Sequence, residues 1–193
     1  MTTPAFAQHL STESPAALRQ QILGYAMTET MTDRERAQFL GLPEGCRMRE
    51  RAKILAPENF TCGKNVWIGE GAVLDAQGGL TIGDETQIGL SVMVWSHSSH
   101  AQALKGETGS SRERIVYKPT RIGSNCFIAG PSVILPGVTI GNGVLIPPMS
   151  VVGEDLPDGA IFKDTRREMK KMQNRIESLE KQLAEVLSRL PTA

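Results

Sequence analysis

Two histidines stand close together near the middle of the chain, in the segment Trp95-Ser-His-Ser-Ser-His100. The ordinary pKa of an imidazole lies near neutrality. A neutral histidine can therefore take a proton from a hydroxyl group and later return it to a leaving group. Either His97 or His100 is a candidate for such a general base, and the alternative is that both are solvated loop residues.

A repeat of six residues surrounds these histidines and must position them. One aliphatic or small residue recurs at every sixth position, with a β-branched or small residue two places before it. No α-helical face has this period, and a flat strand alternates every two residues. The repeat predicts a chain that turns a corner every six residues and makes about four coils of a triangular prism over residues 55–162. The repeating positions are Cys62, Ile68, Leu74, Ile82, Ile88, Val94, Ile122, Ile128, Ile134, Ile140, Ile146 and Val152.

Two breaks interrupt the count. The step from Leu74 to Ile82 is too long for the repeat, which predicts that two residues are extruded near Ala76–Gly79. The step from Val94 to Ile122 is much longer, so a loop over residues 97–119 must leave the coil. A solenoid needs no such loop for stability, and long insertions on solenoids lie at binding surfaces.

Composition excludes several classes of function. The 193 residues carry no formal net charge, which gives no bulk attraction to nucleic acid or to an anionic membrane. No apolar run approaches the ~20 residues of a membrane span, and the N-terminal sequence lacks the pattern of a signal peptide. The three cysteines are widely spaced, so we expect reduced core residues in a cytoplasmic protein.

Helices are predicted on both sides of the repeat. In residues 1–54, one start is Ser14-Pro15 and a second is Thr32-Asp-Arg-Glu35, which has the spacing of a capping box. In residues 163–193, apolar positions are spaced alternately by three and four, as in a coiled coil. That helix is predicted to form a coiled coil with other copies of the chain or to pack along its own prism. Its apolar positions are Met169, Met172, Ile176, Leu179, Leu183, Val186 and Leu190.

The paired Ile-Gly steps, the run Val-Ile-Leu-Pro-Gly-Val-Thr-Ile-Gly at 133–141 and the break that contains the histidines point to one family. In these features the chain resembles the hexapeptide-repeat acyltransferases, and most closely the O-acetyltransferases of the galactoside, maltose and surface-polysaccharide type. The resemblance implies a left-handed parallel β-helix. It also implies acetyl transfer from acetyl-coenzyme A to a sugar or glycan precursor, in a homotrimer with its active sites between subunits.

The resemblance also assigns residues on the acceptor side. The catalytic histidine of the galactoside and maltose enzymes matches His97, which implies direct transfer with His97 as general base. Asp75, Trp95 and His100 match the acceptor side. An equally supported alternative for Asp75 is a turn-forming residue before Gly78-Gly79.

For the donor, the resemblance implies a coenzyme A groove lined by small residues. The matching positions are Ala129, Gly130, Pro148 and Gly153. Arg166 and Arg167 are suited to the nucleotide phosphates, or they belong to a charged helix start. Pro147 and Pro148 depart from the family pattern, since proline has no N–H to offer a pantetheine carbonyl. Glu154 stands where a cation is common.

Three alternatives remain open from the sequence. One is N-acetylation of a nucleotide-linked amino sugar, because basic residues of the loop could bind phosphate. Another is a non-catalytic trimeric scaffold with a degenerate donor groove. A zinc site like that of the gamma-class carbonic anhydrases is poorly supplied, because the remaining histidine, His9, lies outside the repeat. We therefore expect no metal.

Overall fold

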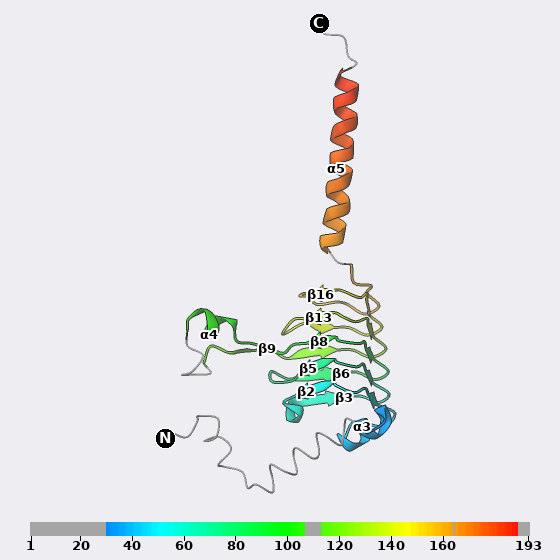
Figure 1. The fold of residues 1–193 in the computed structure, drawn as a ribbon, viewed down its shortest axis with the longest axis vertical. Coiled ribbons are helices and arrows are strands. Elements are labelled where there is room, and N and C mark those ends of the chain that lie inside the picture. The colour runs from blue at the N-terminus through cyan, green and yellow to red at the C-terminus, as the bar shows by residue number, and fades with distance from the viewer. Residues whose placement is uncertain (1–29, 107–112, 164, 189–193) are drawn as a thin grey trace.

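The computed structural model describes residues 30–106, 113–163 and 165–188, and the side chains within the last range from 168 to 185. The chain winds into a stack of short parallel strands. A loop arm leaves the stack on one side, and a long helix leaves it at one end (Figure 1). The helix predicted near Ser14 lies outside the described residues.

The strands stack into three parallel sheets, which form the three faces of the coil. Face A consists of β1 (Arg47–Met48), β4 (Trp67–Ile68), β7 (Gln87–Ile88), β12 (Phe127–Ile128) and β15 (Leu145–Ile146). Face B consists of β2 (Lys53–Leu55), β5 (Val73–Asp75), β8 (Met93–Val94), β13 (Val133–Ile134) and β16 (Val151–Val152). Face C consists of β3 (Phe60–Cys62), β6 (Leu80–Ile82), β11 (Thr120–Ile122) and β14 (Thr139–Ile140).

The six-residue repeat sets which side chains fill the interior. Each strand of two or three residues sends one side chain inward, and the same position of the next coil stacks on it. Ile68 pairs in register with Ile88, and Ile88 with Ile128. The predicted inward positions are confirmed. All but one of these side chains are no more than 2% exposed, and the exception, Cys62, is half-buried. The fully buried ones are Ile68, Leu74, Ile82, Ile88, Val94, Ile122, Ile128, Ile134, Ile140, Ile146 and Val152.

The solenoid has about five turns rather than the four expected, and it begins before residue 55. The additional turn is the charged segment that precedes the repeat. There β1 pairs with β4, and β2 pairs with β5. Arg47 and Lys53 point outward, while Met48 is buried. The segment therefore has the inward and outward alternation of a strand, but its many charged residues hide this pattern in the sequence.

A short helix and the loop arm complete the coil. Helix α3 (Asp33–Phe39) begins with the predicted capping box, in which Thr32 and Glu35 bond to each other's backbone N–H. Arg36 of α3 donates from Nη1 to the carbonyl of Met48 at 2.7 Å, which fixes the helix against the first coil. The arm consists of β9 (His97–Ser98), α4 (His100–Leu104) and β10 (Val116–Tyr117), and a 3-10 turn, η2 (Pro57–Asn59), precedes β3.

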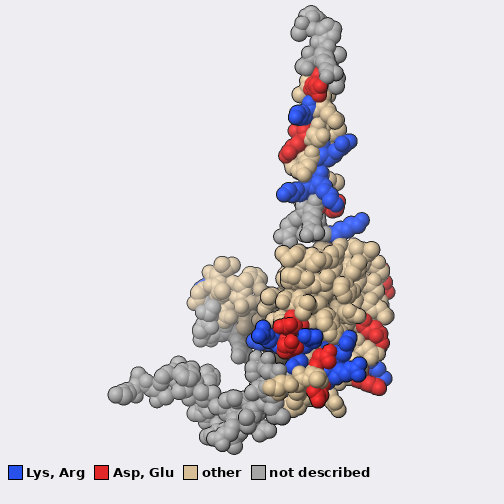
Figure 2. All heavy atoms as spheres, turned by 45° about the vertical axis from the view of Figure 1, so that its right-hand side comes forward, with Lys and Arg blue, Asp and Glu red and all other residues tan. Residues whose placement is uncertain are grey.

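Helix α5 (Thr165–Ser188) stands away from the coils (Figure 1). Its apolar seam is therefore solvent-exposed, with exposed fractions of 49% at Ile176 and 46% at Leu179. This arrangement excludes the alternative in which the helix packs along its own prism. Charged side chains gather over the lower coils and along α5 (Figure 2). No helix within the described ranges has both the length and the apolar character needed to cross a bilayer.

Candidate active site

The candidate site lies at the corner between faces B and C, which we call the B–C corner. In the third coil, this corner is the point where the chain leaves β8 and enters the loop arm. Trp95, Ser96 and His97 follow β8 directly. One coil below, Asp75 ends β5 at the same corner, because Leu74 pairs in register with Val94. The solenoid thus stacks a carboxylate beneath the first histidine of the loop.

Asp75 is fully buried, and both of its carboxylate oxygens accept hydrogen bonds. Oδ2 accepts from the backbone N–H of Ser96 at 2.9 Å and of His97 at 3.1 Å, and it lies 2.6 Å from Nδ1 of the His97 ring. Oδ1 accepts from the backbone N–H of Gln77 at 3.1 Å, which is the turn-forming bond of the alternative prediction. Asp75 therefore lies behind His97, and both of its oxygens bond within the chain.

Its surroundings fix the charge of Asp75. Burial by itself raises the pKa of Asp75, but the hydrogen bonds from Ser96 and His97 outweigh it and hold that pKa below its ordinary value. The carboxylate is then ionised at neutral pH and only accepts hydrogen bonds. A neutral His97 ring bonded to it carries its proton on Nδ1, which leaves Nε2 unprotonated. No described residue forms a hydrogen bond with Nε2.

Two aromatic rings and a pocket surround His97. The ring of Trp95 meets His97 edge to face at 6.4 Å between centroids, and the ring of Tyr117 stacks on it at 6.2 Å. The His97 side chain is 18% exposed. It opens onto a hollow of about 420 Å³, which is lined by Trp95, His97, Ser98, Ser99, His100, Leu135 and Pro136. The ring edge opposite Asp75 can therefore reach a molecule in this hollow.

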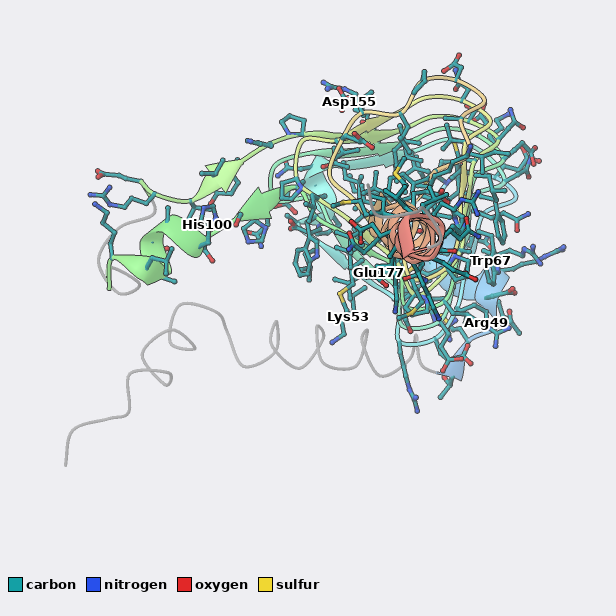
Figure 3. The ribbon with its side chains drawn as sticks, turned by 90° about the horizontal axis from the view of Figure 1, so that it is seen from above. Arg49, Lys53, Trp67, His100, Asp155 and Glu177 are labelled. Carbon is teal, nitrogen blue, oxygen red and sulfur yellow. The ribbon has the colours of Figure 1, made fainter. Side chains whose placement is uncertain are left out.

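His100 lies on the projecting arm (Figure 3). Its Nδ1 is 2.8 Å from Oγ of Ser98, within the same loop, and the residue is exposed. His100 and Trp95 both line the hollow, so each predicted acceptor-side residue except Asp75 faces it. No group of three or more potential metal ligands occurs among the described residues.

The predicted donor residues lie mostly at another corner. Ala129 and Gly130 connect β12 to β13, and Pro148 connects β15 to β16, so all three are at the corner between faces A and B, the A–B corner. A Cβ on Gly130 would lie 1.6 Å from the carbonyl oxygen of Leu90, so this glycine is required by the stacking of coils. Within one chain, these residues are on a different edge of the prism from His97.

Gly153 is the donor residue that lies near His97. It follows β16 at the B–C corner, above Leu135, and a Cβ there would contact a Leu135 methyl group at 3.1 Å. Gly153 and Leu135 are both exposed. The side chains of Arg166 and Arg167 lie outside the described side chains.

Neither the larger hollow nor the cysteines form a competing site. A cavity of about 900 Å³ lies between α3 and the first coil, with mainly apolar walls and no histidine. Cys62 lines it, but burial raises the pKa of its thiol to about 12, so little thiolate is available for attack. Cys46 and Cys126 are buried, and none of the three forms a disulfide.

Sequence reasoning missed four residues of the site: Gly78, Ser96, Tyr117 and Leu135. Ser96 is buried, and its Oγ accepts from the backbone N–H of Gly78 at 2.8 Å. Counting would have placed Asp75 beneath Trp95, two residues before His97, because the lower coils repeat every 20 residues in register, as in Leu55 with Asp75. Tyr117 was not predictable, since its place depends on how the loop returns.

Comparisons with known proteins agree with this geometry. Residues 118–154 match the model of the bacterial transferase hexapeptide family (six repeats). Over 116 residues the chain is 30% identical to WcaF of Escherichia coli K12, a protein named as a colanic acid biosynthesis acetyltransferase, covering 60% of each chain. It is 32% identical over 122 residues to the galactoside O-acetyltransferase of the same organism, covering 58% of this chain and 56% of the relative. The match thus spans less than two thirds of these relatives.

Solved structures show the same fold. The hexapeptide-repeat acetyltransferase VCA0836 of Vibrio cholerae superimposes with a TM-score of 0.64 at 23% identity, covering 76% of this chain and 85% of that one. A galactoside acetyltransferase in complex with coenzyme A superimposes with a TM-score of 0.60 at 22% identity, covering 75% and 74%. The chain therefore has the fold of these hexapeptide-repeat acetyltransferases, and residues 118–154 carry the repeat of the bacterial transferase hexapeptide family.

Proposed function

We propose that the protein is an acetyl-coenzyme A-dependent O-acetyltransferase that acts on a sugar or a surface-glycan precursor. The observation that carries the proposal is the 2.6 Å contact between His97 Nδ1 and the buried Asp75, which leaves the other ring nitrogen at the edge of a hollow. The relatives named for colanic acid and galactoside acetylation support the choice of acceptor class.

The chemistry follows from the protonation of this pair. Nε2 of His97 takes the proton of an acceptor hydroxyl as its oxygen attacks the thioester carbonyl. The C–O bond forms, the C–S bond breaks, and the same proton passes to the departing thiolate. General base catalysis of this kind contributes about 10²–10⁴-fold in rate. Asp75 stabilises the imidazolium that forms between the two proton transfers, and no covalent acyl-enzyme is needed.

The distribution of donor residues favours a site shared between copies of the chain. Within one chain, the A–B corner with Ala129, Gly130 and Pro148 does not meet the B–C corner with His97. In a homotrimer, the A–B corner of one subunit can face the B–C corner of the next. Apolar outward residues on faces A and B fit such contacts, including Met93, Phe127, Leu145 and Val151, which are 39–45% exposed. On face C the outward residues are Thr61, Thr81, Arg121 and Thr139.

The test combines binding and turnover in the full chain. Calorimetry with acetyl-coenzyme A should show micromolar binding for wild type and for His97→Ala, because His97 is proposed to act on the acceptor proton. Release of free coenzyme A should then depend on a hydroxyl-bearing sugar and be lost in His97→Ala. Turnover with amino sugars alone would replace O-acetylation by N-acetylation. Absence of binding at millimolar acetyl-coenzyme A would overturn the proposal and favour the scaffold.

A further inference from the structure

The loop arm returns to the solenoid beside His97. Strands β9 and β10 pair antiparallel, and their register places Tyr117 directly opposite His97. The two rings stack at 6.2 Å between centroids, with 27° between their planes. Directly opposed residues of an antiparallel pair lie on the same side of the ladder, so the register brings these rings together. Tyr117 is 44% exposed, so its position is not explained by burial in a core.

Hydrogen bonds at the neck of the arm fix where Tyr117 stands. By the neck we mean residues 95–98 and 116–120. The backbone N–H of Lys118 donates to the carbonyl of Ser96 at 2.8 Å. Thr120, at the start of β11, donates from Oγ1 to the carbonyl of Trp95 at 2.6 Å. Both bonds join the two ends of the arm on the solenoid side of the Tyr117–His97 pair.

The bond to Asp75 does not by itself fix the orientation of the His97 ring. The bond from Nδ1 to Asp75 fixes one edge of the ring, but a ring held at one edge can still tilt about that bond. Trp95 limits this tilt through an edge contact with 69° between the ring planes. The ring of Tyr117 stacks on the imidazole with 27° between the planes, so it limits rotation of the ring plane from the other side.

We propose that Tyr117 is a positioning residue: its ring holds the plane of His97 so that Nε2 faces the hollow, and closure of the neck thereby sets the orientation of the base. This inference rests on the proposed acetyl transfer for its kinetic consequence, but not for its structural one. An aromatic ring at this position is sufficient, and the phenol oxygen is not required.

The test compares Tyr117→Ala with Tyr117→Phe, and uses Val116→Ala as the matched control. Val116 is on the same strand and pairs with Ser98, so its truncation changes β10 without touching the His97 ring. Nitrogen NMR of histidine-labelled full-length protein reports the His97 ring, whose signals are assigned by their loss in His97→Gln. We expect the same His97 ring signals in wild type, Tyr117→Phe and Val116→Ala, and shifted or broadened His97 signals in Tyr117→Ala, because the ring can then tilt about its bond to Asp75.

The kinetic arm uses the acetyl-coenzyme A turnover assay. Tyr117→Ala should lower kcat about threefold to tenfold, in line with the strength of aromatic pairs, with KM for acetyl-coenzyme A unchanged and Tyr117→Phe close to wild type. Unchanged His97 signals in Tyr117→Ala overturn the proposal, as does equal disturbance by Val116→Ala, which would assign the effect to the strand. The NMR measurement tests the role of Tyr117 even if the protein transfers no acetyl group. A failure of the positioning role can therefore be distinguished from a failure of the proposed acetyl transfer.

Discussion

At the scale of single residues, the central feature is a carboxylate without solvent access. Asp75 has three functions: it accepts the turn bond from Gln77, bonds to the backbone that carries the loop, and orients the His97 ring. These functions require an ionised acceptor. The isosteric Asp75→Asn variant keeps the shape but loses the charge and one acceptor.

We expect Asp75→Asn to fold and to lose most of its acetyl transfer. The amide no longer stabilises the imidazolium and can favour the wrong tautomer of His97. The loss in kcat should approach the range of about 10²–10⁴-fold that a general base contributes. Turnover assays measure it, and calorimetry with acetyl-coenzyme A checks that donor binding persists. A variant with full kcat would contradict the role of Asp75.

The same variant makes a prediction about stability and pH. The pKa of Asp75 is lowered in the folded protein, so near pH 4 the unfolded chain binds more protons than the folded one. The contribution of this group is complete above the unfolded pKa of about 3.9 and is lost as the pH falls through the folded pKa. Urea unfolding at a series of pH values should show the stability gap between wild type and Asp75→Asn narrowing below about pH 4. A gap independent of pH would argue against a depressed pKa.

His97 and His100 differ enough in surroundings to predict different outcomes. His97 is held by Asp75 and two aromatic rings, whereas His100 is exposed on the arm and bonds only to Ser98 among the described residues. His97→Ala should abolish transfer, while His100→Ala should keep most of kcat and change mainly KM for the acceptor. Acceptor-saturation curves for both variants make this comparison. Equal losses of kcat would show that His100 takes part in the proton transfer.

The sequence predicted the position of His97 but not the support beneath it. The break in the repeat placed the histidine at a corner, and this placement is confirmed. The resemblance placed Asp75 near the site, but motif matching does not say which groups a residue bonds to. The direction follows from the coil register, which puts Asp75 one layer below Trp95 and Ser96. Tyr117 returns through a loop of irregular length, for which no periodicity exists to count.

At the scale of elements, the neck of the arm rests on Gly78. A Cβ at this residue would lie 2.0 Å from the carbonyl oxygen of Ser96 and 2.9 Å from the amide nitrogen of Lys118. Both neighbours are backbone atoms, so the neck itself must move. Gly78 also donates its N–H to Ser96 Oγ. The two-residue extrusion that the repeat predicted therefore forms the floor of the site.

Gly78→Ala should lower both stability and turnover. Displacement of packed backbone costs about 1–3 kcal/mol, and it moves Ser96 away from Asp75. Gln77→Ala is the matched control, because it adjoins Gly78 and its side chain is exposed. The midpoint temperature of thermal unfolding and kcat should both fall in Gly78→Ala and stay near the wild-type values in Gln77→Ala. If Gly78→Ala retained wild-type kcat, the neck would not be the element that orients the His97 ring.

The apolar seam of helix α5 packs against no other described part of its own chain. The seam has the spacing of a coiled coil, and the helix stands clear of the solenoid (Figure 1). We expect Ile176→Asp to weaken or dissociate the proposed homotrimer, because it places a charge in a seam that association would bury. Ser178→Asp adds the same charge on the opposite, polar face. Sedimentation equilibrium should give a lower mass for the first variant only, and equal masses would locate the association elsewhere.

The repeat predicted the elements better than it predicted their number. A period of six is decisive where the inward residue is large and aliphatic, as from Ile68 onward. The repeat was not recognised in the first coil, because Met48 and Ile54 are surrounded by arginines, lysines and a glutamate. Only the strand pairing shows that these charged side chains point outward. The capping box at Thr32 was found because its chemistry is local. The loop arm was recognised as an insertion, but its strands and helix α4 were not predicted.

At the scale of the whole molecule, the proposed site is divided between two edges of one prism. The base lies at the B–C corner and most donor residues lie at the A–B corner. If neighbouring subunits complete each site, two inactive variants can restore one another. His97→Ala removes the base, and Pro148→Trp should block the donor groove by placing a large ring at an exposed corner. Pro157→Trp, at the exposed corner between faces C and A, is the matched control and should stay active.

Mixed trimers then give a quantitative outcome. A site works when one subunit supplies His97 and its neighbour supplies an unblocked A–B corner. Trimers that contain both His97→Ala and Pro148→Trp chains should recover about one third of wild-type turnover, because one of their three sites combines the two intact parts. The chains are co-expressed with different tags, and doubly tagged trimers are isolated before the assay. Recovery requires that the two corners come from different chains. Mixed trimers as inactive as their parents would show that each site is built within one chain.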